Sequence, residues 1–176
     1  MTAQLLTLIM EEQLKAQEQI KVLMVCLGNI CRSPTAEAVF RKKVQAENLE
    51  SHLLVESAGT ESWHIGEPPD KRSMQAAKIR GYDMSYQRAR QVSLQDMEEF
   101  DYIYSMDKQN LQDLLAMSAP EQQHKISLFL KQDNSEFEEV PDPYYNGGDG
   151  FELVLDLIEE ASDSLLSALV SRHSLS

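Results

Sequence analysis

Two cysteines, an arginine and a serine fall within eight consecutive residues, Cys26-Leu-Gly-Asn-Ile-Cys-Arg-Ser33. An apolar run ends at Cys26, and helix-forming residues begin after Pro34. Proline is well tolerated in the first turn of a helix, because its missing N–H has no partner there. The pattern predicts a strand, a tight loop and a helix, with Cys26 at the base of the loop and Ser33 as the N-cap of the helix.

Such a loop is suited to binding an anion. A short loop that turns onto a helix N-terminus points backbone N–H groups inward, and the planar guanidinium of Arg32 matches two oxygens of a phosphate. These surroundings favour the thiolate of Cys26, which would then be a nucleophile aimed at phosphorus. Gly28 permits backbone angles that other residues resist, and Asn29 tolerates a left-handed conformation.

The remaining chain alternates strands and helices. Apolar runs predict strands at 21–26, 53–57, 102–106 and 125–128, and periodic patterns predict helices at 34–47, 69–80, 93–100, 107–116 and 151–170. Ser93 and Asp107 are placed to cap helices, and Gly81 to end one. We expect a single α/β domain with a mostly parallel sheet of about four strands, covered by helices on both faces. Ligands of such folds bind at the carboxyl ends of the strands, where the 26–33 loop lies.

Composition narrows the class of protein. The chain has 176 residues, of which 42% are hydrophobic, and this suits one domain with a sizeable core. No apolar stretch approaches the ~20 residues of a membrane span, and we see no signal peptide. Two cysteines within one loop do not resemble an extracellular disulfide framework, so we expect a cytoplasmic protein. A net charge of −13 argues against nucleic-acid binding.

Residues 1–19 precede the first predicted strand. They combine apolar residues such as Leu5 and Ile9 with polar ones such as Glu11 and Glu12, which favours a short helix. We treat 1–19 as an N-terminal extension and 20–176 as the domain. Whether the extension packs on the body, mediates self-association or stays frayed is open at this stage.

The segment from Cys26 to Pro34 resembles the signature of the low-molecular-weight protein tyrosine phosphatases. The similarity runs from about residue 20 to about residue 172, and the family usually begins only a few residues before its first strand. Further similar segments follow in the family's order: Ala36-Glu37-Ala38, Ser57-Ala58-Gly59-Thr60, Ile65-Gly-Glu-Pro-Pro-Asp70, Ala89-Arg90-Gln91, Phe100-Asp-Tyr-Ile103, Met106-Asp107 and Asp142-Pro-Tyr-Tyr145.

The resemblance implies hydrolysis of phosphotyrosine through a cysteinyl-phosphate intermediate. Cys26 would be the nucleophile, Arg32 would bind the phosphate, and Asp142 would protonate the leaving phenolate and later activate water. Ser33 would donate a hydrogen bond to the Cys26 thiolate. The residues expected to bind phosphate or support the loop are Leu27, Gly28, Asn29, Ile30, Cys31 and Ser33.

The same resemblance places aromatic residues along the substrate cleft. Trp63 lies in a Gly- and Pro-rich loop that forms one wall in the family, and an indole suits a phenyl ring. Tyr144 and Tyr145 would lie on the opposite rim. His64 is expected to be solvated, and since no other histidine lies at metal-ligand spacing we expect neither a metal nor another cofactor.

Cys31 is predicted to be a redox partner of Cys26. Peroxide would convert Cys26 to a sulfenic acid, and a neighbouring thiol can capture it before irreversible oxidation. The family uses its matching pair in this way. The alternative is that Cys31 is a small buried filler.

Three other functions compete with phosphotyrosine hydrolysis. An arsenate reductase of the thioredoxin-linked kind needs further cysteines downstream, and a protein-arginine phosphatase has a small polar residue where this chain has Ile30. A silent phosphotyrosine-binding module would not need Cys26, Arg32 and Asp142 together. We expect phosphotyrosine proteins as substrates, inorganic phosphate or another oxyanion as a ligand, and neither nucleic acid nor membrane as a partner. The oligomeric state is open.

Overall fold

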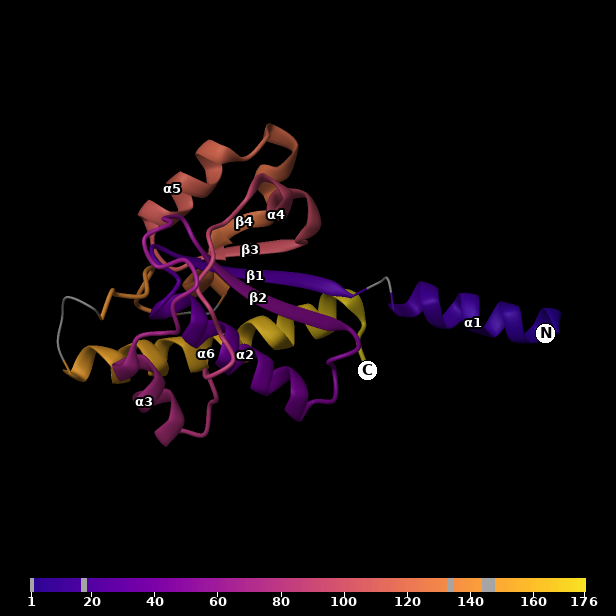
Figure 1. Cartoon of the computed structure of the whole chain (residues 1–176), viewed down its shortest axis with the longest axis horizontal. Coiled ribbons are helices and arrows are strands. Elements are labelled where there is room, and N and C mark those ends of the chain that lie inside the picture. The colour runs from indigo at the N-terminus through magenta and orange to yellow at the C-terminus, as the bar shows by residue number, and fades with distance from the viewer. Residues whose placement is uncertain (1, 17–18, 133–134, 144–147) are drawn as a thin grey trace.

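The computed structural model describes residues 2–16, 19–132, 135–143 and 148–176. Figure 1 shows a sheet covered by helices, with one further helix outside this body. The elements, of which η1 and η2 are 3-10 helices, are α1 (Ala3–Ala16), β1 (Ile20–Cys26), α2 (Arg32–Ala46), β2 (Leu53–Gly59), α3 (Lys71–Ile79), α4 (Leu94–Glu99), β3 (Tyr102–Ser105), α5 (Lys108–Met117), η1 (Pro120–Lys125), β4 (Ile126–Leu128), η2 (Phe129–Gln132) and α6 (Gly148–His173).

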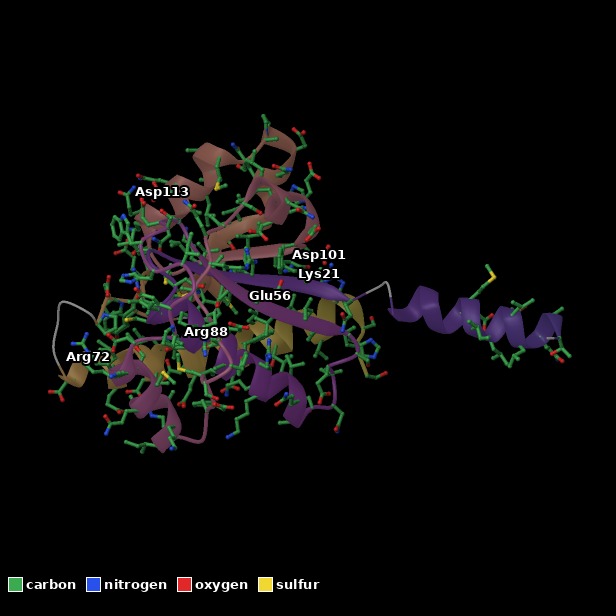
Figure 2. All side chains as sticks on the ribbon, viewed as in Figure 1. Lys21, Glu56, Arg72, Arg88, Asp101 and Asp113 are labelled. Carbon is green, nitrogen blue, oxygen red and sulfur yellow. The ribbon has the colours of Figure 1, made fainter. Side chains whose placement is uncertain are left out.

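The four strands form one parallel sheet in the order β2-β1-β3-β4. Val22 of β1 is in register with Val55 of β2 and with Tyr102 of β3, so β1 is central. Lys21 and Asp101 tie β1 to the segment before β3, because the backbone N–H of Lys21 donates to Oδ2 of Asp101 at 2.8 Å (Figure 2). The predicted α/β class and parallel sheet are confirmed.

Helices cover both faces of the sheet, and the side chains of β1 alternate between them. α2, α3 and α6 lie on one side, and α4 and α5 on the other (Figure 1). Met24 and Cys26 face the core beneath α2 and α6, whereas Leu23 and Val25 face the core beneath α4 and α5. This period of two is that of an extended strand, and it places Cys26 on the face that α2 covers.

Local sequence signals set several helix ends. Ser93 caps α4 in a reciprocal capping box with Asp96, and Asp107 caps α5 through the N–H of Asn110. Gly81 follows α3 with φ of 87°, a left-handed conformation that glycine adopts without strain. These three predictions are confirmed.

The predicted start of the second helix is wrong. We expected the helix to begin at Pro34 with Ser33 as its N-cap, but α2 begins at Arg32, and Cys31 occupies the N-cap without a side-chain hydrogen bond. Ser33 lies inside the first turn, because its hydroxyl is engaged with Cys26 and Asn29. The two 3-10 helices were also not predicted.

α1 lies outside the body, and in Figure 1 it extends away from the end of the sheet at which β1 begins. Its 14 residues fall within the segment that the sequence predicts to be helical. Among the described helices, none is long and apolar enough to cross a membrane.

Candidate active site

The phosphate loop joins the last residue of β1 to the first residue of α2. Cys26 ends the strand, Arg32 begins the helix, and both side chains are buried. Asn29 has a φ of 56°, so the loop makes its turn at the residue that the sequence marks as tolerant of that conformation. The N-terminus of α2 therefore faces the loop, where its free N–H groups and dipole favour an anion.

The end of β2 supports the loop from beside it. The N–H groups of Thr60 and Glu61 donate to the carbonyls of Cys26 and Leu27, each at 2.9 Å. A Cβ on Gly59 would lie 2.7 Å from the carbonyl oxygen of Leu27. No side chain fits at that distance, so glycine is required for β2 to approach the loop.

The side chain of Cys26 is hydrogen-bonded to the hydroxyl of Ser33. The Sγ of Cys26 lies 3.0 Å from the Oγ of Ser33, and Asn29 Nδ2 donates to the same Oγ at 2.8 Å. A thiolate can only accept, so the Ser33 hydroxyl is the donor whenever Cys26 is ionised. These contacts are compatible with Ser33 as a donor to the thiolate and with Asn29 as a brace of the loop, and both roles stay predictions.

A buried carboxylate continues this chain of hydrogen bonds. Asn29 Nδ2 also donates to Ser57 Oγ at 3.0 Å, and Ser57 Oγ donates to Glu37 Oε2 at 2.7 Å. Gln87 Nε2 donates to the same carboxylate oxygen at 2.7 Å. Because a carboxylate only accepts, Ser57 must donate to Glu37. The N–H of Arg90 donates to Asn29 Oδ1 at 3.0 Å, so the Asn29 N–H₂ faces both serine hydroxyls, and the Ser33 hydrogen is directed to Cys26 Sγ or to the Ala58 carbonyl, 3.3 Å away. Burial raises the pKa of Glu37, although Ser57 and Gln87 oppose the rise.

Arg32 is held by an acidic residue that lies between the neighbouring strand β3 and helix α5. Its NH1 donates to Asp107 Oδ2 at 2.6 Å and to the carbonyl of Val140 at 3.1 Å. Its NH2 lies 3.6 Å from Asp142 Oδ2. Burial alone would lower the pKa of Arg32, but Cys26 and Asp107 raise it above the usual value, so the guanidinium is cationic. Asp107 lies just after the C-terminal end of β3, and Cys26 is the last residue of β1. Because these two strands are parallel neighbours in the sheet, their C-terminal ends lie side by side.

A cavity of about 320 Å³ opens above the loop. The three residues predicted to act in catalysis, Cys26, Arg32 and Asp142, all line it. Trp63, predicted to form one wall of the substrate cleft, also lines it and is 64% exposed. His64 was expected to be solvated, but it also lines the cavity and its Nδ1 lies 2.7 Å from Glu67 Oε2. The lining residues are Cys26, Leu27, Gly28, Ile30, Cys31, Arg32, Trp63, His64 and Asp142.

Cys31 differs from Cys26 in its surroundings. Both thiols are free and buried. Burial raises the pKa of Cys31 to about 12, with a smaller opposing contribution from Ser73 and a raising one from Asp70. Cys31 is thus a neutral thiol at physiological pH.

Two of the predicted site residues lie outside the described part of the chain, and four residues near the site were not predicted. Tyr144 and Tyr145, predicted for the cleft rim, lie outside the described residues. Sequence reasoning assigned no part in the site to Asp107, Glu37, Gly59 or Ser57. All four lie in segments that resemble the phosphatase family, and this was the one signal that pointed to them.

The geometry defines the class of site. A cysteine, an arginine and a helix N-terminus around one small cavity, with a carboxylic acid at its mouth, suit nucleophilic attack on a bound oxyanion. In the described part of the chain, no three His, Cys, Asp or Glu side chains are grouped as metal ligands. The site is that of a cysteine-dependent phosphatase.

Comparison with known proteins supports this class. The family "Low molecular weight phosphotyrosine protein phosphatase" matches residues 21–175. The low molecular weight protein-tyrosine-phosphatase YfkJ of Bacillus subtilis is 41% identical over 157 residues, covering 89% of this chain and 99% of the relative.

Solved structures agree with the sequence match. A protein tyrosine phosphatase from Entamoeba histolytica, crystallised with Hepes in its active site, superposes with a TM-score of 0.85 at 40% identity, covering 88% of this chain and 99% of that one. A Drosophila arginine phosphatase gives 0.79 at 37% identity, covering 85% and 97%. The chain belongs to the low molecular weight phosphotyrosine protein phosphatase family, whose members are cysteine-based hydrolases.

Proposed function

We propose that Cys26, Arg32 and Asp142 carry out phosphotyrosine hydrolysis in this protein. The observation that carries the assignment is that all three line one cavity at the N-terminus of α2. Asp107 keeps the Arg32 guanidinium in place, and Ser33 lies against the nucleophile. These contacts supply the positioning that a phosphoryl transfer needs.

In the first step, the Cys26 thiolate attacks phosphorus and the bond from phosphorus to the tyrosyl oxygen breaks. Asp142 gives its proton to that oxygen, because a phenolate with a pKa of ~10 leaves more readily when protonated. Arg32 and the loop N–H groups stabilise the phosphoryl oxygens as charge redistributes. The products are free tyrosine on the substrate and a cysteinyl-phosphate on Cys26.

In the second step, water attacks the cysteinyl-phosphate. The Asp142 carboxylate takes a proton from that water, and the bond from sulfur to phosphorus breaks. Ser33 donates its hydrogen bond to the departing thiolate, which eases its release. Inorganic phosphate leaves, and Cys26 and Asp142 return to their starting states.

The cavity wall favours an aromatic leaving group. Trp63 offers an apolar face for the phenyl ring, and we assign Tyr144 and Tyr145 to the opposite rim on the family resemblance. One relative is an arginine phosphatase, which makes phosphoarginine the second candidate substrate. Ile30 lines the cavity where a small polar residue would be expected for that activity, so phosphotyrosine remains the proposed substrate. Arsenate reduction is disfavoured, because no cysteine follows Cys31.

A redox role for Cys31 is part of the proposal. Peroxide would oxidise the Cys26 thiolate to a sulfenic acid and itself be reduced to water. Attack by the Cys31 sulfur would then form a disulfide and release a second water. Both thiols line the same cavity, which supports the pairing. A reducing cytoplasm would keep the Cys26 thiol reduced and therefore active. We also propose that residues 20–176 form the catalytic domain.

The decisive experiment is Cys26→Ser tested against phosphotyrosine, phosphoserine and phosphoarginine peptides. An alkoxide is far harder to form than a thiolate, so turnover should be abolished while inorganic phosphate still binds. Appreciable hydrolysis by the serine variant would exclude Cys26 as nucleophile. Faster hydrolysis of phosphoarginine than of phosphotyrosine by the wild type would replace the proposed substrate.

A further inference from the structure

α1 has an exposed apolar face, and none of its described side chains belongs to either hydrophobic core of the body. Five large apolar side chains, between 37% and 59% exposed, occupy the short stretch Leu5, Leu6, Leu8, Ile9 and Met10. In Figure 2, α1 extends away from the body, and no side chain of the body is drawn beside it. A helix of 14 residues is marginal by itself in water, so α1 gains stability if this face is covered.

The body has a groove whose lining, like the exposed face of α1, is mostly apolar. A cavity of about 710 Å³ lies between α3 and residues 81–85. From α3 it is lined by Lys71, Met74, Gln75 and Lys78, which share one face at helical spacing. Tyr82 and the buried Met84 close its other side. The groove thus follows one helix along its length, as grooves that accept an amphipathic helix do.

The charges on the two surfaces are opposite. Two lysines, Lys71 and Lys78, line the groove with one acid, Asp83. Lys42 and Glu159 both contact Tyr82 and offset each other, since Lys42 Nζ lies 5.1 Å from the ring centre and Glu159 Oε1 accepts from the Tyr82 hydroxyl at 2.9 Å. A basic border stands out on a chain with a net charge of −13. On α1, the apolar run is followed directly by Glu11 and Glu12.

α1 does not suit the cavity that its own copy offers nearby. A cavity of about 520 Å³ lies between the residues after α2 and the C-terminal part of α6. The segment after α2 adjoins the start of β1, since the N–H of Ile20 donates to the carbonyl of His52 at 2.8 Å. Glu47 and Asp163 line the cavity, and although Asp163 is paired with Lys43, the described lining contains no lysine or arginine that would attract the acids of α1. The groove beside α3 lies on the far side of the body from α1 (Figure 1), and the chain from Ala16 to Ile20 can extend only about 14 Å.

We propose that α1 of one copy docks into the groove between α3 and residues 81–85 of a second copy. The exchange is reciprocal, so each copy gives one helix and receives one. A two-fold arrangement of this kind closes on itself and stops at a dimer. The inference concerns assembly and does not rest on the proposed catalytic roles.

The test is the mass of the full-length protein in solution, measured by sedimentation across a wide range of concentration. We expect a dimer of twice the 20.0 kDa chain that dissociates on dilution. Leu6→Glu with Met10→Glu, or Lys71→Glu with Lys78→Glu, should each raise its dissociation constant about tenfold or more. Combining the lysine reversals with Glu11→Lys and Glu12→Lys should restore the dimer. Gln4→Ser, an exposed change outside the apolar run, is the matched control.

Each other result overturns the proposal. A monomer at every concentration would show that the groove receives no second copy. A dimer lost on changing α1 but indifferent to Lys71 and Lys78 would mean that the α1 helices pair with each other. Binding of α1 to phosphatidylcholine vesicles without self-association would assign the apolar face to a membrane surface. Circular dichroism of every variant checks that the body is folded.

Discussion

Asp107 uses its two carboxylate oxygens for two different tasks. Oδ2 accepts from Arg32 NH1 at 2.6 Å, and Oδ1 accepts from the backbone N–H of Asn110 at 2.7 Å. The first contact orients the phosphate-binding guanidinium, and the second caps α5. The residue therefore links the end of β3 to the start of α2.

Asp107→Asn should separate these two tasks. Asparagine is as good an N-cap as aspartate, so the melting temperature should change little. Its amide N–H₂ would face the N–H of Arg32, and the charged hydrogen bond would be lost. We expect kcat/KM for a phosphotyrosine peptide to fall about 10- to 100-fold, the range for a charge-assisted hydrogen bond.

Asp113→Asn is the matched control, because Asp113 lies on the same helix (Figure 2) and is not among the residues that line the cavity. It should leave kcat/KM unchanged. An Asp107→Asn protein with wild-type kcat/KM would show that Val140 and the loop suffice to hold Arg32.

Asp142→Ala should affect substrates according to their leaving groups. General acid catalysis contributes about 10²–10⁴-fold, and only where the leaving oxygen needs a proton. Phenyl phosphate should therefore lose far more rate than an activated aryl phosphate with an acidic phenol. The measurement is kcat for a series of aryl phosphates. Equal losses across the series would assign Asp142 to the water step or to the fold.

The part of the site that is local in sequence was predictable. Cys26, Arg32 and Ser33 lie in one short loop, so residue types and spacing were enough to bring them together. Glycine and asparagine turn chemistry located the bend at Asn29, where φ is 56°. Asp142 became a candidate acid because an Asp-Pro pair followed a phosphate loop, and the family resemblance gave it a role.

The part that depends on packing was not predictable. Arg32 and Asp107 are separated by 75 residues, and Ser57 and Glu37 by 20, and no local pattern states that they meet. Asp107 was correctly expected to cap a helix, but its second oxygen acts across the sheet. Ser33 was expected to be an N-cap because serine favours that position. Its hydroxyl is instead used by Cys26 and Asn29, so tertiary contacts overrode the local preference.

Cys31→Ser should retain most catalytic activity but recover poorly from peroxide. Cys31 is buried, its thiol pKa is raised to about 12 by burial, and Cys26 lines the same cavity. Wild type exposed to peroxide should regain activity with dithiothreitol, and mass spectrometry should find Cys26 linked to Cys31. Because capture needs the Cys31 thiolate, disulfide formation should accelerate as pH rises. Full recovery by the serine variant would leave Cys31 a packing residue.

Glu37→Gln should change how the stability of the protein depends on pH. Burial raises the pKa of Glu37 above its value in the unfolded chain. The folded state therefore holds this proton more tightly than the unfolded state does. The resulting stabilisation is fully present below the unfolded pKa of ~4.3 and is lost as pH rises through the folded pKa. Glutamine does not titrate, so the variant lacks this dependence.

The measurement is the free energy of urea unfolding of both proteins from pH 4 to pH 8, a window that begins near the ~4.3 of an unfolded glutamate. The difference, wild type minus Glu37→Gln, should fall as pH rises. Glu50→Gln is the matched control, since Glu50 is exposed, and its difference from wild type should stay flat. A flat difference for Glu37→Gln would mean that Ser57 and Gln87 offset the burial completely.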